Sequence, residues 1–145
     1  MLIKLIPKQI PVFWDTIKYG CRSANTVHQE HYQPYFNELL HALLSDKAQC
    51  FVRLDENRVI IAILVTRFIG NKITGEKDFH LQSAYSFKTE PKDVWAKDFK
   101  VLVDVALKAN CANITFETSN PKLAALGTTV GFREVSRLYT YKIGG

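Results

Sequence analysis

Three side chains are of types that can take a proton from a reacting group: the imidazole of His80 and the carboxylates of Asp78 and Glu117. Each also has a plain structural interpretation. His80 fits one polar position of an alternating strand, Asp78 fits a turn, and Glu117 fits a half-exposed strand carboxylate. The residue types permit acid–base chemistry without assigning it.

The cysteines and histidines do not form a metal-ligand pattern. Cys21, Cys50 and Cys111 are odd in number, widely spaced and without a Cys-x-x-Cys pair, and no nearby cysteine completes a set with His28 and His31. We therefore expect no metal site and no disulfide framework. Reduced thiols indicate a cytoplasmic, reducing compartment.

The composition is that of a globular protein, with 47% hydrophobic and 23% charged residues, and the length of 145 residues predicts a single domain over 1–145. The longest wholly apolar run, residues 59–65, is much shorter than the roughly 20 residues needed to span a membrane. The net charge of +5 comes from scattered lysines and arginines, so nucleic acid is not the expected partner.

The most distinctive spacing lies in the last third of the chain. A predicted strand at 114–117 is followed by a polar turn, an apolar helix face and a Gly-Phe pair, with Asn120 twelve residues before Phe132. Asn120 can cap the helix that Pro121 begins, and Gly131 can end that helix with a positive φ. The face of this helix consists of Leu123, Leu126 and Val130.

Hydrophobic periodicity predicts the elements that position these residues. Strands are expected at 2–6, 49–54, 58–68, 78–88, 114–117 and 132–143, and helices at 11–23, 34–44, 93–110 and 121–130. Asp93 is the expected cap of the third helix. This order predicts an α/β fold with a mixed, mostly antiparallel sheet and helices on both faces.

This order and the spacing around Asn120 resemble the GCN5-related N-acetyltransferase (GNAT) superfamily over essentially the whole chain. The resemblance implies an acyl-CoA N-acyltransferase fold, acetyl-CoA as cofactor and an amine substrate. It further implies that the pantetheine arm lies between two splayed strands. The backbone atoms of Tyr85, Ser86, Phe87 and Lys88 would contact the arm, and Asn120 would help to order it.

The resemblance also gives His80, Asp78 and Glu117 a role, as candidate general bases for the amine. The chain departs from the family at two places. A tyrosine that protonates the CoA thiolate in many members corresponds here to Gly127. The family's pyrophosphate loop, Arg/Gln-x-x-Gly-x-Gly/Ala, corresponds to a glycine-free segment in which Glu90, Asp93 and Trp95 replace the key residues. Compensating charge could come from Lys88, Lys92 and Lys97.

Two functions stay open at this point. The chain is either an N-acyltransferase with a degenerate pyrophosphate loop, or a catalytically silent module that binds a protein partner. It also loosely resembles acetyltransferase-like proteins of tailed bacteriophages, which implies virion association as an alternative to the cytoplasm. An aromatic set could wall an acceptor groove or pack in the core: Tyr32, Tyr35, Phe36, Tyr139 and Tyr141.

Overall fold

A five-stranded sheet in the order β1-β2-β3-β4-β5 forms the centre of the computed structural model, which describes residues 1–25 and 27–144. The strands are β1 (Ile3–Lys4), β2 (Ala48–Leu54), β3 (Ile60–Gly70), β4 (Lys77–Ser86) and β5 (Asn113–Phe116). The pairs β1–β2, β2–β3 and β3–β4 are antiparallel, and β5 pairs with β4 in parallel. The predicted mixed, mostly antiparallel sheet is therefore confirmed.

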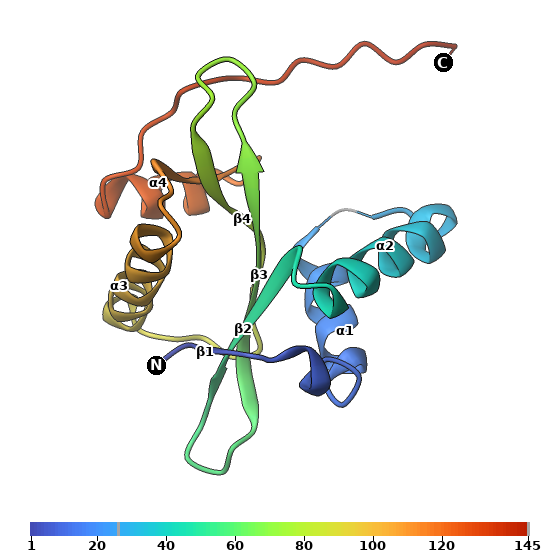
Figure 1. The fold of residues 1–145 in the computed structure, drawn as a ribbon, viewed down its shortest axis with the longest axis vertical. Helices are drawn as coiled ribbons and strands as arrows, with labels where there is room; N and C mark the ends of the chain where they lie inside the picture. Colours follow the sequence, from blue (N-terminus) through green and yellow to red (C-terminus); the bar gives the residue numbers. More distant parts are fainter. Residues whose placement is uncertain (26, 145) are drawn as a thin grey trace.

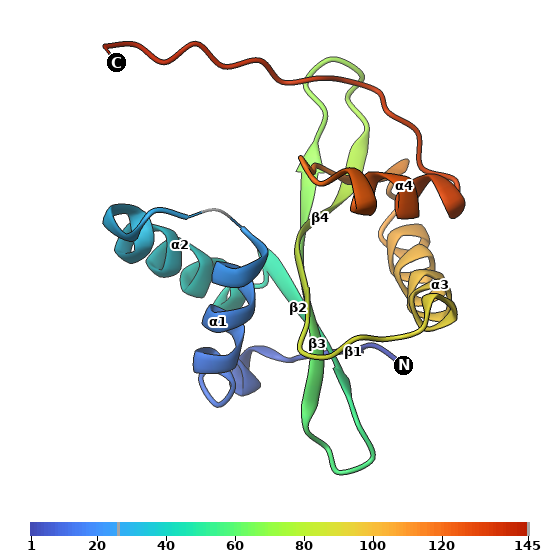
Figure 2. The same cartoon turned by 180° about the vertical axis from the view of Figure 1, so that it is seen from behind.

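Helices cover both faces of this sheet (Figures 1 and 2). One layer holds α1 (Trp14–Ala24) and α2 (Tyr32–Leu44), and the other holds α3 (Lys92–Lys108) and α4 (Pro121–Thr129). Two short 3-10 helices, Pro7–Gln9 and Gln29–His31, precede α1 and α2. None of the helices in the described residues has the length and apolar character required to cross a membrane.

Alternation along β2 divides the core into two clusters. Cys50 and Val52 face α1 and α2, where they pack with Ile17 and Leu39, whereas Phe51 faces α3. The second cluster joins Phe51 to Leu2, Leu64, Phe79, Leu102 and Ala106. Burial of each large apolar side chain contributes about 1.5–3 kcal/mol, so the two clusters fix both helical layers on the sheet.

The predicted cap of α3 is wrong. The helix begins at Lys92 after Pro91, whose ψ of 149° is extended, and no side chain caps its first turn. Asp93 lies inside that turn. Proline at this position cannot donate a backbone hydrogen bond, which suits the residue just before a helix.

The predicted final strand at 132–143 is also wrong, because this segment has no ladder partner among the described residues. It leaves α4 as an extended chain (Figure 1). Its large apolar side chains are 78–88% exposed: Val135, Leu138, Tyr139, Tyr141 and Ile143. Residues of these types favour a pleated, half-buried surface. They form a strand only where the backbone of a neighbouring strand pairs with theirs. Tyr139 and Tyr141 therefore do not join the core.

Candidate functional site

The site begins where β4 and β5 separate. Their parallel pairing ends at Leu81 and Phe116, and β4 continues to Ser86 while pairing only with β3. Within the described residues, the backbone of 82–86 has no strand partner on the β5 side. The two strands thus open into a wedge with free backbone groups along one wall.

A β-bulge lies at the narrow end of this wedge. Val65 pairs with Ser83 and Thr66 pairs with Leu81, which leaves Gln82 outside the register. A bulge bends its strand and redirects the local backbone groups. Here it falls directly after the last β4–β5 pair, so the redirected groups lie at the mouth of the wedge.

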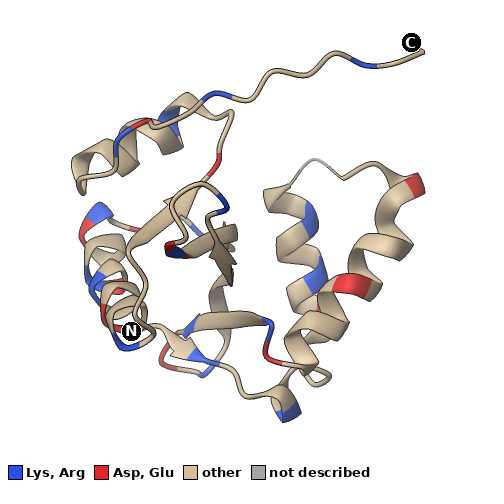
Figure 3. Cartoon of the chain, turned by 45° about the horizontal axis from the view of Figure 1, so that its top comes forward, with Lys and Arg blue, Asp and Glu red and all other residues tan. Residues whose placement is uncertain are grey.

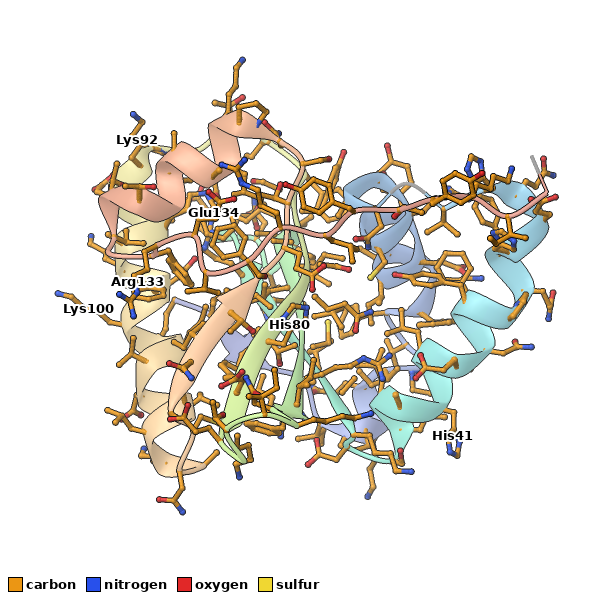
Figure 4. All side chains as sticks on the ribbon, turned by 90° about the horizontal axis from the view of Figure 1, so that it is seen from above. His41, His80, Lys92, Lys100, Arg133 and Glu134 are labelled. Carbon is orange, nitrogen blue, oxygen red and sulfur yellow. The ribbon has the colours of Figure 1, made fainter. Side chains whose placement is uncertain are left out.

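The sequence-predicted proton acceptors meet beside this point. Nδ1 of His80 lies 2.9 Å from Oγ1 of Thr115 on β5, and Nδ2 of Asn113 donates to Asp78 at 2.9 Å. Burial lowers the pKa of His80, while the charges of Glu117 and Asp78 act in the opposite direction. Figure 4 shows His80 on β4, near the middle of the molecule. The imidazole is therefore neutral near neutral pH and can accept a proton.

A polar cluster around Ser83, on the α1 and α2 side of the sheet, was not indicated by the sequence. Asn25 Nδ2 donates to Oγ of Ser83 at 2.6 Å and to the Tyr35 hydroxyl at 3.3 Å. Ser83 is buried and follows the bulged Gln82. Burial raises the pKa of Tyr35, so its hydroxyl stays protonated. Three separate elements form this cluster, and no local pattern could have linked them.

The four residues expected along the arm follow β4 outward. Tyr85 packs edge-on against Tyr19 of α1, with ring centroids 5.9 Å apart, and Phe87 stacks on Tyr19 at the same centroid separation. Ser86 Oγ donates to the carbonyl oxygen of Lys88 at 2.6 Å. The aromatic contacts hold the end of β4 on α1, away from β5, and so maintain the wedge.

Asn120 caps α4 as expected: its Oδ1 accepts from the Lys122 amide at 3.0 Å. Gly131 follows the helix with a φ of 106°, a conformation that favours glycine. Phe132 then packs on Phe116 of β5 with ring centroids 4.8 Å apart. A role for Asn120 in ordering a cofactor arm remains a prediction.

The position of the family tyrosine, Gly127, is filled by a neighbouring ring. A Cβ atom built on Gly127 would lie 2.7 Å from Cζ of Phe116 and 3.5 Å from Cβ of Phe132. Real Cβ atoms do not approach so closely. The lack of a side chain at 127 therefore has a packing cause in this chain.

Glu90 lies inside the protein rather than at an anion site. Its carboxylate pairs with the guanidinium of the buried Arg53, which also contacts Asp98 Oδ2 through Nε at 2.8 Å. The guanidinium lies 5.4 Å from the ring centre of Trp95. The sequence signal was Arg53 itself, a single charge within the apolar run of β2. Because Glu90 pairs with Arg53, its carboxylate is no longer one of the negative charges that would oppose a phosphate.

These residues can be compared with the needs of an acyl-CoA molecule. The free edge of β4 suits the amides of a pantetheine arm, and the first turn of α3 presents N–H groups that no side chain caps. Lys92 projects from that turn (Figure 4). The glycines that allow close approach of phosphates are absent between Gly75 and Gly127. The free β4 edge has backbone groups of the kind that such an arm would need, and binding of its phosphate end would depend on α3 and its lysines.

Nucleic acid and metal ions have less support as ligands. Basic and acidic residues are interspersed along α3 in Figure 3, as on an ordinary solvated face. In the described part of the chain, no group of three or more His, Cys, Asp or Glu residues is arranged to hold a metal ion.

Comparison with known proteins supports the architecture. No family model matches the sequence, and no curated protein matches it. Among solved structures, a probable acetyltransferase matches with a TM-score of 0.74 and 12% identity, over 100% of this chain and 99% of its own. A predicted acetyltransferase with acetyl-CoA from Clostridium acetobutylicum matches at 0.72 and 15%, over 99% and 96%.

A third solved structure is the ribosomal-protein-alanine N-acetyltransferase from Brucella melitensis biovar Abortus. Its TM-score is 0.70 at 12% identity, and the match covers 99% of each chain. In all three, the likeness covers 99% or more of this chain. The chain has the fold of the GCN5-related N-acetyltransferases.

Proposed function

We propose that the protein is an acyl-CoA-dependent N-acyltransferase. The observation that carries the proposal is the coincidence of the Gln82 bulge with the point where β4 and β5 separate. This arrangement places free backbone groups of β4 beside a neutral histidine and a buried hydroxyl cluster. Solved structures of the same fold include one with acetyl-CoA and one aminoglycoside N-acetyltransferase in complex with CoA.

Bound acyl-CoA would supply an activated acyl group along the β4 edge. Backbone N–H groups near Gln82 would stabilise negative charge developing on the acyl carbonyl oxygen. His80, held by Thr115, would take the proton that the attacking amine loses, with Glu117 supporting the resulting imidazolium. The new C–N bond replaces the C–S bond, and the thiolate leaves.

The departing thiolate needs a proton, and Gly127 cannot provide one. The protonated hydroxyl of Tyr35 is held beside the bulge by Asn25 and is the donor we assign. Among the other hydroxyls, Thr128 Oγ1 already donates to the Ala124 carbonyl oxygen at 3.1 Å. Loss of a general acid lowers a rate by about 10²- to 10⁴-fold, so a less well aligned donor predicts a slow enzyme.

A second candidate function is a catalytically silent module that binds a protein partner over the wedge. Phe116 filling the space at Gly127 and the glycine-free start of α3 favour it. Cytoplasmic and virion-associated forms of such a module are both compatible with this proposal.

Calorimetric titration with acetyl-CoA, desulfo-CoA and ADP separates the two candidates. Micromolar binding of acetyl-CoA and desulfo-CoA supports the acyltransferase, and absence of binding at millimolar concentration contradicts it. The variant Lys92→Glu should weaken binding about tenfold, because it reverses a charge in the first turn of α3. Lys100→Glu, farther along the same helix, is the matched control (Figure 4).

A further inference from the structure

The guanidinium of Arg67 joins two elements of the candidate site. Arg67 lies on β3 opposite His80 of β4, and its Nε–H donates to the side-chain oxygen of Gln82, the residue at the bulge. Its two terminal nitrogens donate to the two carboxylate oxygens of Glu38 on α2, at 2.8 and 2.6 Å. One planar group therefore binds the bulge on one side and α2 on the other.

This link fixes geometry more than it adds stability. The Arg67 side chain is 22% exposed and the Glu38 side chain is 60% exposed, and so open a pair contributes little to the free energy of folding. Hydrogen bonding from Arg67 lowers the pKa of Glu38, and the charge of His41 acts in the same direction, so the carboxylate is ionised near neutral pH. Because the guanidinium is rigid, rotation away from Glu38 also disturbs its bond to Gln82.

The link reaches the hydroxyl assigned as the proton donor. Tyr35 lies one turn before Glu38 on the same face of α2. Burial raises the pKa of Tyr35, and the side chains of Ser83 and Gln82 act against this rise, which puts Gln82 beside the hydroxyl. Arg67 thus contacts both the bulge and the turn of α2 that follows Tyr35.

The charge of Arg67 also acts on His80. Burial lowers the pKa of His80, Glu117 and Asp78 raise it, and Arg67 lowers it further. These charges come from three directions: β3 carries Arg67, β4 carries Asp78, and Glu117 directly follows β5. From α2, Glu38 faces this group through its pair with Arg67. Arg67 is therefore the cation that opposes the carboxylates around the imidazole.

We propose that Arg67 is a positioning residue, which holds the Gln82 bulge and the Tyr35 turn of α2 in one arrangement and keeps a positive charge beside His80. The inference rests on the proposed function, since the bulge, Tyr35 and His80 have their roles there. Arg67 acts through these groups rather than on the reacting atoms. Its loss should therefore lower the rate of acyl transfer more than the affinity for acetyl-CoA.

Three variants separate the geometry from the charge. Arg67→Met removes both, Arg67→Lys keeps the charge without the planar fork, and Glu38→Gln releases α2 from Arg67. Lys18→Met is the matched control, because it breaks an ion pair with Asp15 in which both residues belong to α1. Since all these side chains are partly exposed, matching circular dichroism spectra will verify that the variants fold.

NMR measures the link without a substrate. Glu38→Gln should shift the side-chain amide signals of Gln82 in the wild-type background and leave them unshifted in Arg67→Met, because Arg67 carries the effect. The pKa of His80 should rise toward 6.5 in Arg67→Met. It should stay at the wild-type value in Arg67→Lys and in Lys18→Met.

Kinetics measure the consequence for the proposed reaction, with acetyl-CoA as donor and n-butylamine as the probe acceptor. In Arg67→Met and Arg67→Lys, kcat should fall by about 10- to 10²-fold, with the KM for acetyl-CoA nearly unchanged. Lys18→Met should retain the wild-type kcat. The double variant of Arg67→Met and Glu38→Gln should be no slower than Arg67→Met alone, because both changes break the same link.

Several results would overturn the proposal. A Gln82 shift of equal size in both backgrounds means that α2 and the bulge are connected by another path, and no shift means that they are not connected. An unchanged His80 pKa in Arg67→Met, or an unchanged kcat, removes the role of Arg67. A wild-type protein that neither binds acetyl-CoA nor transfers its acetyl group contradicts the proposed function instead, and the NMR results then decide alone whether the link exists.

Discussion

The ring of Phe116 occupies the space next to Gly127, with Cζ 2.7 Å from the place of a Cβ atom at that residue. Phe116 ends β5 and Gly127 lies in α4, so this contact joins the wedge to the helix that closes it. At position 127, where many acetyltransferases have a proton-donating tyrosine, this chain therefore has a glycine in contact with an aromatic ring. Restoring a side chain there requires a change at both positions.

Gly127→Ala should destabilise the protein by about 1–3 kcal/mol, since the added methyl group is forced against the ring. In a protein that already carries Phe116→Leu, Gly127→Ala should cost less stability, because leucine lacks the ring atoms at the contact. Urea denaturation of the two single variants and the double variant measures this coupling. Strictly additive effects would show that the contact is not the cause.

The buried charges around Arg53 predict that removing one of them destabilises the protein more than replacing all of them. Arg53→Met leaves the carboxylates of Glu90 and Asp98 buried without their cation, and should cost about 3–5 kcal/mol. Replacing Arg53, Glu90 and Asp98 together by apolar residues of similar size should cost much less stability. Equilibrium unfolding of both variants tests the prediction.

The exposed pair of Lys108 and Asp104 on α3 is the control for this cluster, with its nitrogen and oxygen 3.0 Å apart. Asp104→Ala should change stability by less than about 1 kcal/mol, as is usual for surface pairs. Similar losses in Arg53→Met and Asp104→Ala would mean that burial of the cluster contributes nothing.

The fold could be predicted because its signals are local. Apolar periodicity marked the helices, and Asn120 marked the start of α4. The failures have a shared cause in long-range pairing. The sequence predicts that Glu90 opposes an anion, because nothing local reveals its pairing with Arg53, which is distant in sequence. The strand expected at 132–143 has the right residues, but a strand also needs an edge to pair with, and sequence alone does not place one.

The same limit applies to the site. His80 is predicted as a candidate base from its residue type and its strand, a prediction that stays open, and its contact with Thr115 depends on the β4–β5 register. Tyr35 was recognised only as an aromatic residue for a groove or the core. Its meeting with Ser83 requires α2 to lie over the bulge in β4, which is a tertiary relationship without a local signal.

Tyr35→Phe tests the assignment of the proton donor. The variant keeps the ring and removes the hydroxyl beside Asn25, so acetyl transfer should slow by about 10²-fold or more with little change in acetyl-CoA affinity. A donor to the thiolate also shapes the alkaline side of the pH–rate profile, and that limb should disappear in the variant. Tyr32→Phe, also on α2, is the matched control. An unchanged rate and profile would remove Tyr35 from the mechanism.

His80 predicts a dependence of stability on pH. Burial holds its pKa in the folded protein below the ordinary value of 6.5, so the unfolded chain binds the proton more tightly. The free energy of unfolding should therefore be fully retained above pH 6.5 and should fall as the pH drops from 6.5 toward the lower, folded-state pKa. His80→Gln should remove this part of the decline, as measured by urea unfolding at pH 7.5 and 5.5. His41→Gln, at an exposed position of α2, should leave it unchanged. An identical decline in wild type and His80→Gln would show that another group carries it.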